Sequence, residues 1–230
     1  EAGDGKDWFG ESAVQVPDLV QAELRGLIAT IGHDVRLELE PQHGVEIADV
    51  LNDLDSSAPG QWRLPNLIAG MPIEVVVKLR VPPAAGVTEL LRVRVSWTSP
   101  HQADRLQVAR ALIVPAVPDS EWQALAEDPA VRERALSLET ARVKLRASEA
   151  MAQGDVGTTR DLLCASYGAW ASAPASLTAT EEMEALGRLQ EDLAAGSAPR
   201  FQKRSKFQHY TRSHSRPMTD KHPPKDKDPK

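Results

Sequence analysis

The sequence predicts an α+β protein whose two kinds of structure are segregated: an antiparallel β-sandwich followed by an antiparallel helical hairpin or bundle. Two observations predict this class. Between residues 34 and 115, apolar and polar residues alternate in about six short runs separated by turn residues, which is typical of a sandwich. After Pro118 the apolar residues recur at three and four positions, which indicates amphipathic helices.

Four segments are expected along the 230 residues. Residues 1–32 form a lead-in and a helix, 33–117 the β-sandwich, 118–215 a helical arm and 216–230 a disordered tail. The first helix is expected over 17–32, because Pro17 suits a first helical turn and Gly32 suits the position just past the end. The tail has too few apolar residues to bury a core.

The strands are predicted from alternation with a period of two, at 35–39, 45–51, 62–64, 73–81, 90–97 and 106–114. None of the segments between them is long enough for a parallel crossover, so the pairing should be antiparallel. Five apolar side chains in these runs are expected to be buried: Val75, Val77, Leu79, Val93 and Val95.

The helical arm is predicted from capping residues. Asp119 or Ser120 precedes a short helix, and Asp128 with Pro129 begins a long one. After a turn at 154–155 the next helix follows, and Thr178 or Thr180 caps another. The hairpin around the turn at 154–155 looks like a single unit of the tetratricopeptide type, whereas repeat proteins usually stack three or more.

Composition narrows the class of protein. A single cysteine, Cys164, excludes an intramolecular disulfide, and we expect it to be a small buried apolar residue. No apolar run approaches the roughly 20 residues that span a bilayer, and the first residues lack the pattern of a signal peptide. These features favour a cytoplasmic protein. Because the chain does not begin with Met, we also expect it to be a fragment of a longer protein.

The residues that might carry chemistry do not form a complete set. Asp53, Asp55, Ser56 and Ser57 are close to a carboxylate–hydroxyl metal cluster, but their order and the following Ala-Pro-Gly favour a solvated loop. No His or Cys spacing typical of a zinc site occurs, and no glycine-rich phosphate loop or nucleophile motif does. We therefore predict that the chain is not an enzyme and has no metal and no cofactor.

One charged segment calls for a functional explanation. The net charge is −6, yet from Arg200 onward ten Lys/Arg stand against three Asp/Glu. Aromatic and basic side chains interleave there, as they do in proteins that bind single-stranded nucleic acid. The candidate polyanion contacts are Arg200, Lys203, Arg204, Lys206, Phe207, Tyr210 and Arg212. The alternative is a last helix that packs Phe201 and Phe207 against the bundle and exposes its basic side.

Several stretches together resemble bacterial von Willebrand factor A-domain proteins of the Ca-activated-chloride-channel-like group. They are VPDLVQAELRGLIATIG, VEIADVLND, WRLPNLIAGMPIEVVVKLRVP, ELLRVRVSW, LIVPAVPDSEWQAL and RFQKRSKFQHY, and the resemblance covers about residues 8–216. It implies that this chain is the C-terminal part, a β-sandwich with a helical tail. The A domain with its Asp-x-Ser-x-Ser metal site would precede residue 1 and be absent.

Three functions remain open at this stage. The first is a non-catalytic scaffold or protein-interaction module that recruits a protein partner or self-associates. The second is binding of nucleic acid or another polyanion through the basic C-terminal segment. The third is an enzyme whose site is assembled from scattered residues, which a pocket with converging titratable groups would indicate.

Overall fold

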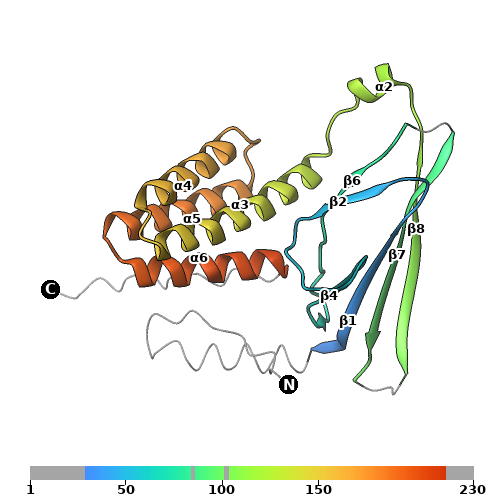
Figure 1. Ribbon diagram of the computed structural model, residues 1–230, viewed down its shortest axis with the longest axis horizontal. Helices are drawn as coiled ribbons and strands as arrows, with labels where there is room; N and C mark the ends of the chain where they lie inside the picture. The colour runs from blue at the N-terminus through green and yellow to red at the C-terminus, as the bar shows by residue number, and fades with distance from the viewer. Residues whose placement is uncertain (1–28, 84–85, 101–103, 216–230) are drawn as a thin grey trace.

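The computed structural model describes residues 29–83, 86–100 and 104–215, and in it antiparallel strands are followed by helices (Figure 1). This agrees with the predicted mixture of antiparallel sheet and helix. The expected lead-in, most of the helix expected over 17–32, and the expected disordered tail at 216–230 lie outside the described residues.

Two antiparallel sheets are formed, a six-stranded one in the order β3-β4-β1-β7-β8, with β5 paired to β1, and a two-stranded one of β2 and β6. The strands are β1 (Thr30–Pro41), β2 (Glu46–Val50), β3 (Ser56–Ala58), β4 (Gln61–Leu64), β5 (Leu67–Ile68), β6 (Val77–Arg80), β7 (Val87–Thr98) and β8 (Arg105–Pro115). The alternation in the sequence therefore predicted the long strands, whereas β3 and β5 were missed.

The start of β1 differs from the expectation. Residues 30–32, expected as the end of a helix, belong to the strand, and Thr30 and Gly32 pair with β5. A Cβ atom on Gly32 would come within 2.6 Å of the Trp97 ring. Gly32 thus permits close packing of an indole, whereas the sequence suggested a helix end.

The sheet region has one buried apolar cluster, to which both sheets contribute side chains. Val35, Leu37 and Leu39 of β1 are buried, and Val45 and Val50 from the second sheet region join them. The five side chains expected to be buried, Val75, Val77, Leu79, Val93 and Val95, are only partly buried against this cluster. In the described residues the second sheet has two strands, β2 and β6.

The run expected as one strand over 73–81 forms a strand only at β6. A side chain explains the difference: the backbone N–H of Val76 donates to Asn52 Oδ1 at 2.9 Å, and the carbonyl oxygen of Glu74 accepts from Asn52 Nδ2 at 2.8 Å. This part of the backbone therefore finds its hydrogen bonds outside a strand ladder.

Short polar side chains cap three of the helices by hydrogen bonds. The short helix after Pro118 has no side-chain cap, so the cap expected from Asp119 or Ser120 is wrong, and the last helix has none either. Their bounds are α2 (Asp119–Ala124), α3 (Pro129–Ala152), α4 (Val156–Ala171), α5 (Leu177–Ala194) and α6 (Ala198–Ser213). The carboxylate of Asp128 accepts from the N–H groups of Ala130 and Val131 at 2.8 and 3.2 Å, as capping predicts. For α5 the cap is Ser176, not Thr178 or Thr180, because its hydroxyl accepts from Ala179 N at 2.9 Å.

A second core lies among the helices. α3 contacts α4, α5 and α6, α4 contacts α5, and α5 contacts α6. Leu163, Trp170, Leu186, Leu189 and Phe201 are almost fully buried in it. The indole N–H of Trp170 donates to Thr140 Oγ1 at 2.8 Å, so the largest side chain in this core has its polar group satisfied.

Candidate interaction surface

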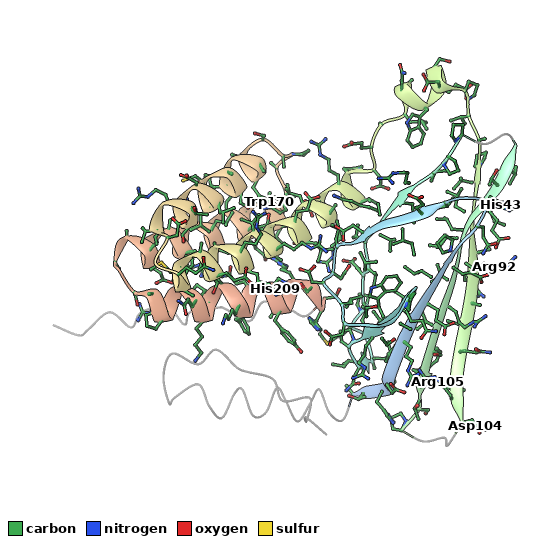
Figure 2. The ribbon with its side chains drawn as sticks, in the orientation of Figure 1. His43, Arg92, Asp104, Arg105, Trp170 and His209 are labelled. Carbon is green, nitrogen blue, oxygen red and sulfur yellow. The ribbon has the colours of Figure 1, made fainter. Side chains whose placement is uncertain are left out.

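One constellation has the residue types of a catalytic triad. His209 of α6 is labelled in Figure 2. Its Nε2 lies 3.1 Å from Asp53 Oδ2 and 3.3 Å from Ser213 Oγ. In a triad, the acid binds one ring nitrogen and the nucleophile the other. Here both contacts converge on the same nitrogen, and Ser213 is buried. The arrangement does not fit proton relay, and it connects α6 to the loop after β2.

The loop expected to be solvated has a structural role at one end. Asp53, with φ of 49°, contacts His209 and also Arg142 Nη2 at 2.7 Å. Ser56 and Ser57 lie in β3. In the described ranges no group of three or more His, Cys, Asp or Glu is placed to hold a metal ion. Asp53 therefore contributes to the contact between the sheets and the helices.

That contact is polar and dense. Arg142 of α3 makes a two-pronged ion pair with Asp49 at 2.6 and 3.1 Å and donates to the Val50 carbonyl at 2.8 Å. The hydrogen bonds from Arg142 hold the pKa of Asp49 below its usual value. The buried side chain of Asn52 donates to the Ser213 carbonyl at 3.0 Å as well as to that of Glu74. Strands and helices are thereby joined.

Replacing Asn52 by Ala should weaken this contact. The change removes the partners of Val76 N–H and of the Ser213 carbonyl, and the Glu74 carbonyl keeps only the hydrogen bond from Ser215 Oγ at 3.3 Å. We expect a loss of about 2–3 kcal/mol in the free energy of unfolding. Chemical denaturation measures it. Gln42→Ala is the matched control, because the Gln42 amide donates at the surface to Glu40. If Asn52→Ala were as stable as the wild type, the contact between strands and helices would not depend on this side chain.

A buried ionic cluster holds three helices together. Lys144 of α3 and Glu182 of α5 are fully buried with Lys144 Nζ 2.6 Å from Glu182 Oε2, and Arg212 Nε of α6 is 2.5 Å from Oε1. Burial opposes charge on Glu182, but Lys144 and Arg212 lower the pKa of its carboxyl overall. Burial also opposes the charge on Lys144, and this lowers the pKa of its ammonium group.

The residues proposed as polyanion contacts do not form one surface. All lie on α6, but Arg204 is buried 3.5 Å from Asp192, and Arg212 binds Glu182. Arg200, Lys203, Lys206 and Tyr210 are exposed, and Phe207 is half-buried. Phe201 is fully buried, as the helix-docking alternative expected. The sequence could not separate the two kinds of cation, because the acidic partners come from α5.

The expectation that Cys164 is buried is wrong. It is exposed on α4, not buried, with Sγ 3.9 Å from the Gln190 amide. Helical spacing places Leu163 and Ser166 on the buried face instead. The expectation failed because it used the residue type and not the position of Cys164 on the helix.

Several exposed apolar side chains lie on β8 and in the segment that follows it. Val108 and Leu112 of β8 are 41% and 42% exposed. α2 has no buried residue, its Trp122 is 66% exposed, and it stands apart from the sheets and the other helices (Figure 1). Leu125 and Val131 are exposed as well. Exposed apolar side chains of this kind are found at protein-interaction sites.

Comparison with known proteins gives structural matches only. No family model and no curated protein matches the sequence. The structure matches the ArnB paralog VWA2 from Sulfolobus acidocaldarius with a TM-score of 0.55 at 14% identity, over 92% of this chain and 49% of that one. It also matches a von Willebrand factor type A protein from Catenulispora acidiphila with a TM-score of 0.50 at 14% identity, over 77% and 43%.

These matches correct one expectation. The sequence was interpreted as lacking the von Willebrand A-type part, but proteins of that type match 92% and 77% of this chain, which has a fold found in them. The interpretation rested on stretches that resemble the part of such proteins after the A domain, and at 14% identity short stretches are a poor guide to which part of a fold is present. The chain spans about half the length of either match. Among the described residues, no helix combines the length and apolarity needed to cross a membrane.

Proposed function

We propose that this chain is a non-catalytic scaffold for protein interaction, in which the two sheets form a β-sandwich and α3 to α6 form a helical bundle. The observation that carries the proposal is the exposed apolar surface of β8 and α2. The polar contact through Arg142 and Asn52 supports it, because a rigid junction presents that surface in a fixed orientation.

Site-specific photocrosslinking tests the proposal. A photoreactive amino acid at position 108 or 122, in the full chain and in the cells that make it, should form a discrete crosslink to another polypeptide. The control is the same group at Asp161, which is exposed on α4. Crosslinks that are as abundant from position 161, or none from 108 and 122, would contradict the proposed role of this surface.

Polyanion binding is the second candidate, supported by the exposed Arg200, Lys203 and Lys206 of α6. Binding to a single-stranded oligonucleotide should then be weak, independent of base sequence and steeply reduced by salt. Lys203→Glu with Lys206→Glu should abolish it in fluorescence anisotropy. Arg132→Glu, at an exposed arginine at the start of α3, is the control. Undiminished binding by the double variant, or no binding by the wild type at low salt, would reject this candidate.

A further inference from the structure

The geometry of β8 identifies the kind of partner, an inference that rests on the proposed interaction function. β8 pairs with β7 along its whole length, from Arg105 opposite Thr98 to Pro115 opposite Val87. It ends the order of the larger sheet, so in the described part of the chain no strand pairs with its other edge. In an antiparallel strand, alternate residues direct their N–H and C=O groups to that edge. A long open edge of this kind is a template for an added strand.

The apolar inner face of the sheet continues onto β8. Leu37 lies opposite Val95, and Val95 lies opposite Val108, so Val108 shares the face that is buried at β1. Leu112 lies opposite Leu91 on the same face. Leu37 and Leu91 are 4% exposed, whereas Val108 and Leu112 are ten times more so. The apolar face therefore extends beyond the part that the second sheet covers.

Arg110 lies in the middle of this exposed face, and no described residue supplies it with a carboxylate partner. Arg110 is opposite Val93 and between Val108 and Leu112. Other arginines of β7 and β8 pair with carboxylates: Arg92 with Glu89 at 2.6 Å, Arg94 with Glu38 at 3.0 Å and Arg105 with Asp34 at 2.6 Å. Arg110 donates to its neighbour's carbonyl, Ala109 O, at 2.9 Å, and forms no ion pair within the described ranges. The edge thus offers one positive charge flanked by apolar side chains.

We propose that an extended segment of a partner polypeptide adds to the edge of β8 as a further strand. An Asp or Glu of that segment lies beside Arg110, and aliphatic residues two positions before and after it pack over Val108 and Leu112. Opposite charges on neighbouring strands stabilise the pair, and like charges destabilise it. A second copy of this chain fits less well, because symmetric antiparallel pairing centred on Arg110 would place the two guanidinium groups against each other.

Two synthetic peptides test the charge requirement. The first is Val-Thr-Val-Thr-Glu-Thr-Val-Thr-Val, and the second has Lys in place of the central Glu. Both are titrated into the full chain while backbone amide resonances are followed by NMR. We expect shifts concentrated at 105–115 and an affinity about fivefold or more higher for the Glu peptide. In Arg110→Glu this preference should reverse.

Backbone methylation tests the strand geometry. Methylating the peptide nitrogens at every second residue should abolish binding in one of the two alternating patterns and preserve it in the other. The proposal would be overturned if neither unmodified peptide bound, or if the resonance shifts lay away from β8. Equal affinity of the two peptides would overturn it as well. Dimerisation of the free chain through β8 in sedimentation would also overturn it. If photocrosslinking from position 108 persisted in Arg110→Glu, the proposed scaffold function would be retained. The proposal that an acidic residue of the added strand pairs with Arg110 would be rejected.

Discussion

Replacing Glu182 by Gln should lower the free energy of unfolding by about 3–5 kcal/mol, because it leaves the fully buried Lys144 without its anion and removes the nearer carboxylate of Arg212. Glu182 is the shared anion of both cations, at 2.6 and 2.5 Å, and lies fully buried in the middle of the helices. The amide has nearly the same shape as the carboxylate, so packing changes little. The loss therefore measures charge compensation.

Glu181→Gln is the matched control. Its side chain is half exposed and lies 3.8 Å from Arg212. A surface ion pair of that kind contributes about 0–1 kcal/mol. Urea denaturation of both variants at pH 7 gives the comparison. Equal, small effects of the two changes would show that the buried cluster tolerates the loss of its anion.

The same cluster predicts a pH dependence. The pKa of Glu182 is lower in the folded protein than in the unfolded chain, where it is about 4.3. The unfolded state therefore takes up the proton first on acidification, so the contribution of Glu182 is complete above that pH and is lost as pH falls through the folded-state pKa. Glu182→Gln should lack this part of the acid destabilisation. Denaturation midpoints at neutral pH and near pH 3 should differ less in the variant than in the wild type.

The sequence predicted those features that local patterns determine. Alternation with a period of two marked β1, β7 and β8, and Asp128 before Pro129 marked the start of α3. Both signals are local, because side chains alternate between the two faces of a strand and a capping residue binds N–H groups two or three residues further on. The length of β6 was not predictable, because its start depends on Asn52, more than twenty residues away in the chain.

The candidate surface was less predictable because it depends on what covers each strand. β8 alternates as β7 does, and its pattern predicted a strand without indicating how far that strand is covered. Its exposure follows from its place at the edge of the larger sheet, which is a matter of topology. The position of Arg110 within the apolar face was the available signal, because inward-facing charges are typical of edge strands.

The buried polar residues of the helices were hidden for a related reason. Glu182 and Lys144 are separated by 38 positions, and Arg204 packs near Asp192 of another helix. Charged residues of a helix usually face the solvent, because burying an unpaired charge costs much free energy. They are buried only where an opposite charge pairs with them. Their partners come from tertiary packing, so the basic segment of α6 was interpreted as a surface when part of it faces inward.

The buried and the exposed sides of α6 should differ in how much they contribute to stability. Phe201→Ala should destabilise the protein by about 3–5 kcal/mol, since it removes a fully buried aromatic ring from the helical core and leaves a cavity. The ring packs in the cluster that contains Leu163, Trp170 and Leu186. Phe207→Ala is the control on the same helix, and its half-buried ring should cost clearly less. Chemical denaturation measures both. If Phe201→Ala were as stable as the wild type, or less costly than Phe207→Ala, α6 would not be anchored through this ring.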